Sequence, residues 1–119
     1  MATILPTRTK LPDLVDYHNI AITAWPLLAN GDEGGACTVC RPADLTVQIF
    51  GTFGAGGTLV IDGTLDGIHW SPMTDTFGVP IAAMASKLLT LADVPLAIRP
   101  RVVDGDKTTS LTVLLLGRV

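Results

Sequence analysis

Two apolar–polar alternations separated by glycine-rich turns dominate the middle of the chain. Residues 45–53 and 58–64 alternate as half-buried strands do, because successive side chains of a strand point to opposite faces. Residues 54–57 form a glycine-rich turn between them, and Leu65-Asp66-Gly67 leads on to residues 68–70. Asp-Gly between such runs is a strong hairpin signal, since glycine accepts the positive φ of the turn. The pattern predicts a three-stranded antiparallel meander.

The same alternation, followed along the chain, predicts eight short strands. They are Ile20–Leu28, Leu45–Phe53, Thr58–Thr64, His69–Thr74, Val79–Ala83, Ser86–Leu91, Ala97–Val103 and Ser110–Leu116. The turn at residues 104–107 predicts a hairpin joining the last two strands. Pro100 lacks an N–H donor, which predicts that its strand lies at a sheet edge or over a bulge. Residues 29–41 are expected to form a long glycine-rich loop. Strands of this number and spacing predict a two-sheet antiparallel sandwich, jelly-roll or immunoglobulin-like.

The composition favours β-structure throughout. The chain has 15 Thr and ten Asp but a single Glu and only three Lys. Thr fits a pleated sheet and Asp fits turns, whereas Glu and Lys usually fill the solvent-facing side of helices. Twelve Gly and eight Pro supply the breaks that many short strands need. We therefore expect an all-β protein, and a length of 119 residues predicts one domain with a real core.

The first 18 residues show no sustained period and predict an extended N-terminal arm ahead of a β-sandwich domain at residues 19–119. Pro6 and Pro12 favour the extended form. The arm is expected to lie along its own domain or to tether a neighbouring subunit. Its apolar side chains are the expected contacts: Ile4, Leu5, Leu11, Leu14 and Tyr17.

The chain is more apolar than expected for a small monomer. Hydrophobic residues make up 48% and charged residues 16%, and the mean hydropathy is +0.47. Strand 110–116 is apolar on both faces, because Leu114 and Leu116 occupy the positions that alternation would make polar. Such a strand is either central in the sandwich or covered by another subunit. We expect a homodimer or homotrimer in which Leu114 and Leu116 contact the partner.

Charge and hydropathy argue against two other classes of partner. The net charge is −3 with no basic block, so nucleic acid is not expected as a partner. The longest apolar runs, such as Val113–Leu116, are far too short to span a bilayer, so no membrane is expected either. Residues 1–10 lack the apolar core of a secretory signal, which predicts a protein that is not exported by that route.

Cys37 and Cys40 form the one C-x-x-C pair, a spacing found in redox sites and in half-sites for zinc. A redox site needs a helix N-terminus, and a zinc site needs two more ligands, for which only His18 and His69 are available as nitrogen donors. Neither histidine has a recognisable ligand spacing. We expect small, semi-buried, reduced thiols, and no metal or cofactor.

No catalytic constellation is present. Asp62 and Asp66 flank a turn and are expected to cap backbone N–H groups rather than to transfer protons. His69 and Trp70 alternate along a predicted strand, so one faces inward, and Trp70 is the expected core anchor. Arg99 and Arg101 share one face of a strand and are expected to form a solvated edge rather than a phosphate site. An enzyme is not expected.

The turn-bearing segments resemble those of small structural proteins of tailed bacteriophages. Gly51-Thr52-Phe53-Gly54, Asp62-Gly63-Thr64-Leu65-Asp66-Gly67-Ile68-His69-Trp70 and Ile98-Arg99-Pro100 follow that family's two hairpin patterns, and Gly105-Asp106 continues the second. The chain departs from the pattern at Thr64, often Ser in the family, and at Lys107, where a Gly is replaced. The resemblance begins at Val47 and leaves residues 1–44 uncovered. Its motifs describe turns rather than a binding site.

The resemblance implies a virion protein of the capsid cement or decoration type with a jelly-roll-like sandwich. Such a protein would be made in the host cytoplasm and would sit on the capsid surface, where it clamps subunits of the major capsid protein. The alternative is a carbohydrate-binding or tail-fibre adhesion module. That module would need exposed aromatic side chains, for which Tyr17, Trp25 and Trp70 are the candidates.

Overall fold

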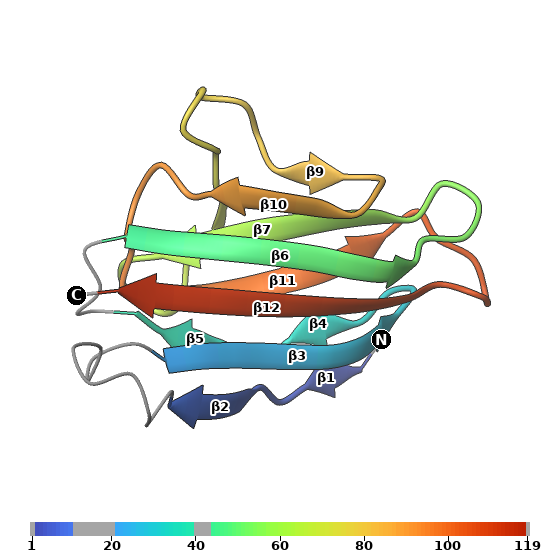
Figure 1. The fold of residues 1–119 in the computed structure, drawn as a ribbon, viewed down its shortest axis with the longest axis horizontal. Helices are drawn as coiled ribbons and strands as arrows, with labels where there is room; N and C mark the ends of the chain where they lie inside the picture. Colours follow the sequence, from blue (N-terminus) through green and yellow to red (C-terminus); the bar gives the residue numbers. More distant parts are fainter. Residues whose placement is uncertain (1, 11–20, 40–43, 119) are drawn as a thin grey trace.

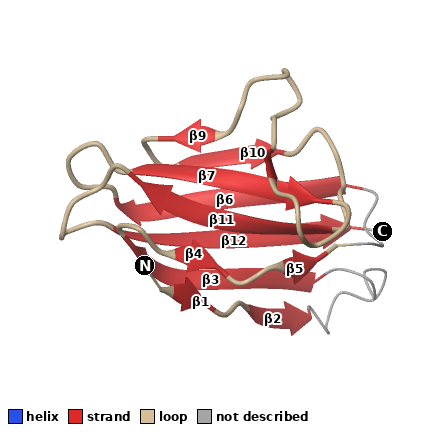
Figure 2. Ribbon diagram, turned by 180° about the vertical axis from the view of Figure 1, so that it is seen from behind, coloured by secondary structure: helices blue, strands red, loops and turns tan. Residues whose placement is uncertain are grey.

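Two β-sheets packed face to face form the part of the chain that the computed structural model describes, residues 2–10, 21–39 and 44–118 (Figures 1 and 2). Sheet A has the order β1 (Thr3–Ile4), β4 (Glu33–Gly34), β11 (Ala97–Val103), β7 (Thr58–Thr64) and β8 (Ser71–Pro72), with β5 (Cys37–Thr38) also on β11 and β9 (Ala82–Ala83) also on β7. Sheet B has the order β10 (Lys87–Thr90), β6 (Asp44–Thr52), β12 (Ser110–Arg118), β3 (Ala21–Ala29) and β2 (Thr7–Lys10). The prediction of an all-β, two-sheet sandwich is confirmed.

Strand pairing is antiparallel at every described pair except β1 with β4, which is parallel. The bounds predicted for residues 58–64 and 97–103 match β7 and β11. The predicted loop at residues 29–41 contains β4 and β5, because both pair with the distant β11 and show no local alternation of their own. The strands predicted at residues 69–74 and 79–83 shorten to the two-residue β8 and β9.

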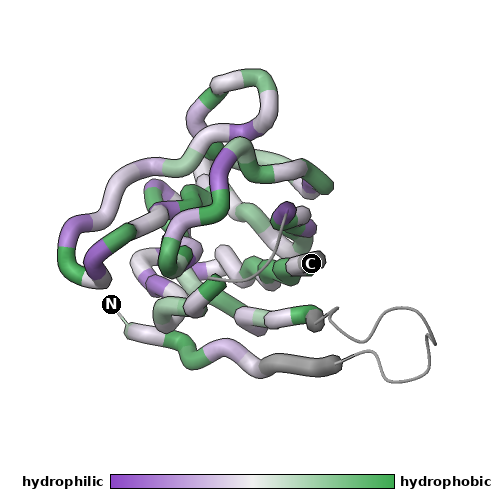
Figure 3. The backbone as a smooth tube through the Cα atoms, turned by 90° about the vertical axis from the view of Figure 1, so that its left-hand side faces the viewer, coloured by the Kyte–Doolittle hydropathy of each residue, from purple (hydrophilic) through white to green (hydrophobic). Residues whose placement is uncertain are grey.

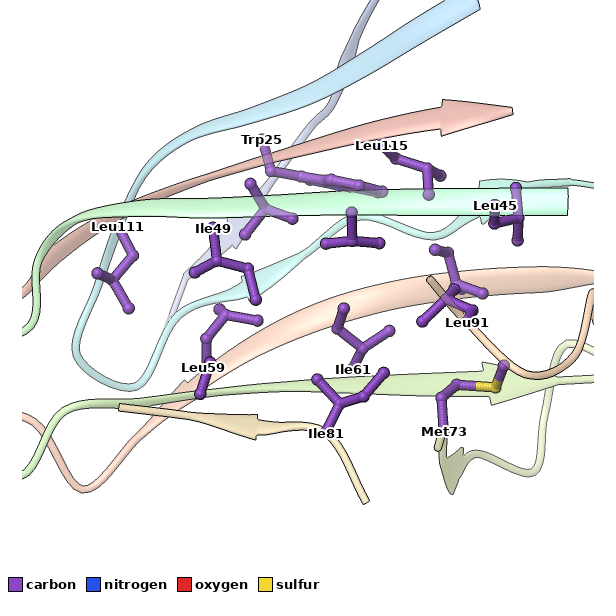
Figure 4. Packing of buried hydrophobic residues seen from close by; sticks show 14 of the residues in the cluster. Trp25, Leu45, Ile49, Leu59, Ile61, Met73, Ile81, Leu91, Leu111 and Leu115 are labelled. Atoms are coloured by element: carbon purple, nitrogen blue, oxygen red, sulfur yellow. The ribbon is translucent and has the colours of Figure 1, made fainter. Parts of the chain in front are cut away.

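The core lies between the two sheets (Figure 4). Alternation places Leu45, Val47 and Ile49 of β6 inward, and residues 111, 113 and 115 of the neighbouring β12 point to the same side. The buried cluster comprises Trp25, Leu28, Val39, Leu45, Val47, Ile49, Leu59, Ile61, Met73, Ile81, Ala83, Leu91, Ile98, Val102, Leu111, Val113 and Leu115. Burial of each Val, Leu or Ile side chain contributes about 1.5–3 kcal/mol, so this layer is the main source of stability.

Trp25, not Trp70, is the aromatic anchor of the core, so the prediction for Trp70 is wrong. Trp25 is completely buried, and its Nε1 donates a hydrogen bond to the carbonyl of Gly35 at 2.9 Å. Trp70 is half-buried on sheet A. Trp25 lies in an apolar run, whereas Trp70 lies between His69 and Ser71 at the end of a turn.

The predicted meander and the predicted C-terminal hairpin are both wrong. β6 and β7 belong to different sheets, as do β11 and β12, so both connections cross from one layer to the other. The tip of each connection bonds the other: the carboxylate of Asp106 accepts the N–H of Ala55 at 2.9 Å, and Thr109 Oγ1 donates to the carbonyl of Phe53 at 2.9 Å. Only β7 and β8 form the expected antiparallel pair.

Pro100 lies over a bulge in a central strand. β11 is flanked by β7 on one side and by β4 and β5 on the other, so the edge position is wrong. Arg101 pairs with Glu33 and Ile98 with Cys37, which leaves one more residue on the β4–β5 side than on β11 between these pairs. The N–H of Val102 donates to the carbonyl of Asp32, so the donor missing at residue 100 faces this interruption, as the bulge prediction required.

The described part of the predicted arm lies along its own domain. β1 pairs with β4, and β2 pairs with β3, so residues 3–10 extend both sheets on the same side of the sandwich (Figure 1). Ile4 packs against the core, and the N–H of Gly35 donates to the Ile4 carbonyl at 2.7 Å.

Candidate functional site

A compact charge network lies on the outer face of sheet A. Alternation along β7 and β11 sends Ile61 and Ile98 inward and therefore places Asp62, Arg99 and Arg101 outward. Asp62 is only 4% exposed, because both arginine side chains cover it. Arg101 Nε donates to Asp62 Oδ2, and Arg99 Nε lies 4.0 Å from the same oxygen.

The network extends to β4 and to the strand pair β7–β8. Arg99 Nη1 lies 3.5 Å from Glu33 Oε2. The Arg99 guanidinium stacks over the ring of Trp70, 4.2 Å from its centroid, a cation–π contact. The two arginines of the interior strand β11 are thus neutralised by carboxylates of β4 and β7, so the prediction of a solvated edge for Arg99 and Arg101 is wrong. The same balance leaves no excess positive charge for a phosphate.

The β7–β8 turn is held by one carboxylate. Asp66 Oδ1 accepts the N–H groups of Ile68 and His69, each at 2.8 Å, and Oδ2 lies 2.6 Å from His69 Nδ1. The bond to the His69 side chain, followed by those to the backbone, lowers the pKa of Asp66 well below its usual range. Gly67 has φ +78°, as the turn signal requires. The capping role predicted for Asp66 is confirmed, whereas for Asp62 it is wrong, because Asp62 is ion-paired with Arg101.

The outer face of sheet B has the opposite character. Residues 22–29 of β3, 45–52 of β6 and 110–117 of β12 include no charged side chain. Across the strands, Leu88, Gln48, Leu114 and Ala24 lie in one outward row. A second outward row contains Thr90, Thr46, Leu116 and Ile22. Figure 1 looks onto this face, which we call the uncharged face.

The predicted partner contacts fall into three groups. Leu114 and Leu116 are half-buried at the centre of the uncharged face, since β12 lies between β6 and β3. Ile4 is packed on the core of its own domain, and Leu5 is 77% exposed beside it, so the structure does not bring these two together with the β12 leucines. Leu11, Leu14 and Tyr17 lie outside the described residues.

Two features of the surface escaped the sequence analysis. The Arg99–Trp70 stack joins β11 to the connection between β7 and β8, and no sequence spacing reveals it. Phe77, at the tip of the β8–β9 loop, is 89% exposed. Asp75 and Gly78 around it are a turn signature that could have located the loop, although not the exposure of the ring.

Few groups are available to hold a metal or to transfer electrons. Within residues 2–10, 21–39 and 44–118 no three His, Cys, Asp or Glu side chains gather as metal ligands. Cys37 is half-buried with Sγ 3.8 Å from Thr23 Oγ1, whereas Cys40 and His18 lie outside the described residues. Over the same part of the chain, no helix long and apolar enough to cross a membrane is found.

Comparison with models of protein families, with curated proteins and with solved structures found no significant match to this chain.

Proposed function

We propose that this chain is a bacteriophage capsid decoration protein with a jelly-roll-like sandwich, which self-associates and binds the outside of the major capsid lattice. The single observation that carries this proposal is the uncharged face, because residues 22–29, 45–52 and 110–117 of its three central strands include no charged side chain. The leucines of this face, Leu88, Leu114 and Leu116, are apolar surface that is stabilised when protein covers it. The turn motifs that resemble those of phage structural proteins support a capsid as the assembly.

The size of the uncharged face supports a second copy of this chain as its cover. β3, β6 and β12 are nine residues long, and β10 and β2 beside them have four residues each. With strands about 4.8 Å apart and about 3.4 Å per residue, sheet B spans an area on the order of 600 Å². A standard interface buries about 800 Å² on each partner. Two copies of this face bury no unpaired charge against each other, although the chain as a whole carries −3.

The two described tryptophans do not offer the adhesion alternative an open indole face. Trp25 is fully buried, and one face of Trp70 is covered by the Arg99 guanidinium. A sugar ring needs an open indole face to stack on. Neither described tryptophan favours a carbohydrate-binding module over the decoration protein.

The direct test is co-sedimentation of the purified protein with empty shells assembled from the major capsid protein of the same genome. We expect saturable binding with a fixed number of copies per shell, and shells that melt at higher temperature when occupied. Leu114→Glu should lower occupancy, because a dissociated subunit loses the avidity of an oligomer. A folded wild-type protein that stays in the supernatant at micromolar concentration would refute the proposal.

A further inference from the structure

The loop between β8 and β9 presents the most exposed of the large hydrophobic side chains in the described residues. Phe77 is 89% exposed and Val79 is 55% exposed. In Figures 1 and 3 this loop projects above the rest of the sandwich. Single exposed apolar residues are common on protein surfaces and need no explanation. Phe77 differs from such residues because hydrogen bonds fix the backbone on both sides of it.

Asp75 fixes the backbone on both sides of Phe77. The N–H of Asp75 donates to the Val79 carbonyl at 2.9 Å, and the Asp75 carbonyl accepts the N–H of Gly78 at 3.0 Å. Asp75 Oδ1 also accepts the N–H groups of Phe77 and Val79, at 2.8 and 3.1 Å. Gly78 supplies the φ of +78° that lets the chain turn back. The tip is therefore an internally bonded turn rather than a loose excursion.

Both ends of the loop are attached to the body of the sandwich. Thr74 forms a β-bridge with Pro80, and Asp75 forms one with Leu91 at the end of β10. The N–H of Ala92 donates to the Thr74 carbonyl at 3.0 Å. Because the turn is ordered before any partner arrives, little conformational entropy is left to lose on binding.

We propose that Phe77, with Val79 beside it, is an anchor that enters an apolar pocket on a neighbouring protein subunit. This inference rests on the proposed function, and the subunit is the major capsid protein of the lattice. A rigid aromatic side chain seated in a pocket is the kind of contact that carries most of the energy of an interface. The loop thus supplies the contact to the capsid, while the uncharged face supplies the contact between copies.

Charge favours a protein pocket over a lipid surface. Residues 71–86 contain Asp75 and no Lys or Arg, and the chain carries −3 overall. Loops and helices that insert at membrane surfaces place basic residues beside the apolar ones, where they meet anionic headgroups. This loop has no such residues on either side of Phe77.

The test measures affinity for empty capsid shells by co-sedimentation with four variants. Phe77→Ala removes the anchor, and we expect affinity to fall at least tenfold, which corresponds to 1.4 kcal/mol. Asp75→Ala removes the acceptor that positions Phe77 and should also weaken binding, whereas Asp75→Asn keeps an acceptor oxygen and should restore most of it. Leu65→Ala, at an 81% exposed residue of another turn, should bind as the wild type does. Thermal melting of each variant confirms that it is folded.

The outcomes separate this inference from the proposed function. Failure of the wild-type protein to bind shells would overturn both. Wild-type binding that Phe77→Ala leaves unchanged, or that Leu65→Ala weakens equally, would overturn the anchor and leave the decoration protein standing. Binding of the wild-type protein to phosphatidylcholine–phosphatidylserine vesicles, lost in Phe77→Ala, would also overturn the protein pocket and assign the anchor to lipid.

Discussion

Gly34 lies where the β4 backbone packs directly against two rings of the core, so a side chain at this position has no room. A Cβ at Gly34 would lie 2.6 Å from Cδ of Pro100 and 2.6 Å from Cδ1 of Trp25. Only a glycine lets the β4 backbone approach both rings so closely. The same approach brings the Gly35 carbonyl within 2.9 Å of the Trp25 Nε1 donor, so the buried indole keeps its hydrogen bond.

Gly34→Ala is therefore expected to lower the free energy of unfolding by about 1–3 kcal/mol, because neither ring has room to move. Urea unfolding followed by tryptophan fluorescence measures this. Gly35→Ala is the matched control, since its Cβ would first meet Leu5 Cδ2 at 3.3 Å, the end of an exposed and flexible side chain. The control should change stability by less than about 0.5 kcal/mol. Equal losses in the two variants would contradict the close-approach argument.

At the residue scale, the sequence predicts which face of a strand a side chain occupies better than it predicts which tryptophan is buried in the core. Period-2 alternation places residues such as Val47 and Val113 on the buried face of their strands, because the pleat determines the direction of a side chain locally. The choice between Trp25 and Trp70 failed, because it depends on which strands of the second sheet lie opposite. The pairing of Arg101 with Asp62 escaped prediction for the same reason, since 39 residues separate the two in sequence.

At the scale of elements, the strand positions agree with the sequence prediction better than the connections between the strands do. Glycine-rich and Asp-Gly turns at residues 53–57 and 104–109 have the composition of hairpin turns, yet each links the two sheets. The two connections bond to each other, and a Cβ at Gly54 would lie 2.4 Å from Asp106 Oδ1. Strand positions follow from local alternation, whereas the sheet to which a strand belongs depends on such contacts between distant turns. Sequence therefore predicted a sandwich but not its strand order.

Asp106 makes the joint between these connections sensitive to acid. Hydrogen bonds from the Thr108 side chain and then from the N–H groups of Ala55 and Thr108 lower the pKa of Asp106 to about 2. An unfolded Asp titrates near 3.9, so the carboxylate stabilises the fold above about pH 4, and this contribution is lost as the pH falls toward 2.

Asp106→Asn should consequently melt at a lower temperature than the wild type at pH 6, and the difference should shrink between pH 4 and pH 2. Differential scanning calorimetry over this range measures the effect. Asp93→Asn, at an exposed residue outside these two connections, is the control. Its difference in melting temperature from the wild type should not shrink between pH 4 and pH 2. A constant difference between wild type and Asp106→Asn down to pH 2 would argue against the assigned cause.

At the scale of the whole molecule, charge is divided between the two broad faces. Glu33, Asp62, Arg99 and Arg101 neutralise one another on sheet A, whereas residues 22–29, 45–52 and 110–117 of sheet B include no charged side chain. The sequence analysis correctly found the apolar outer positions of β12 but not the charge network opposite. Local alternation reveals the apolar outer positions, whereas the charge network can be found only from the register of three strands.

This division predicts that self-association depends on the uncharged face. Light scattering at micromolar concentration should show a homodimer or homotrimer, and Leu114→Glu should shift it to the monomer, because a carboxylate would be buried without a partner. Val60→Glu is the matched control: residue 60 is half-buried, lies on the opposite face and pairs with Arg101, which can receive the new charge. A wild-type monomer, or equal dissociation by both variants, would exclude the uncharged face as the interface.

The crossing of β6 to β7 and of β11 to β12 between layers also determines how the chain must fold. Neither sheet can be completed from a continuous stretch of sequence, because β6, β10 and β12 of sheet B alternate along the chain with β7 and β11 of sheet A. Loops must close over long separations before native contacts compensate for the entropy, which places folding in the millisecond-to-second range typical of such topologies. Half a sandwich would expose unpaired strand edges. The two layers are thus expected to form in one cooperative step, with no stable single-sheet intermediate along the way.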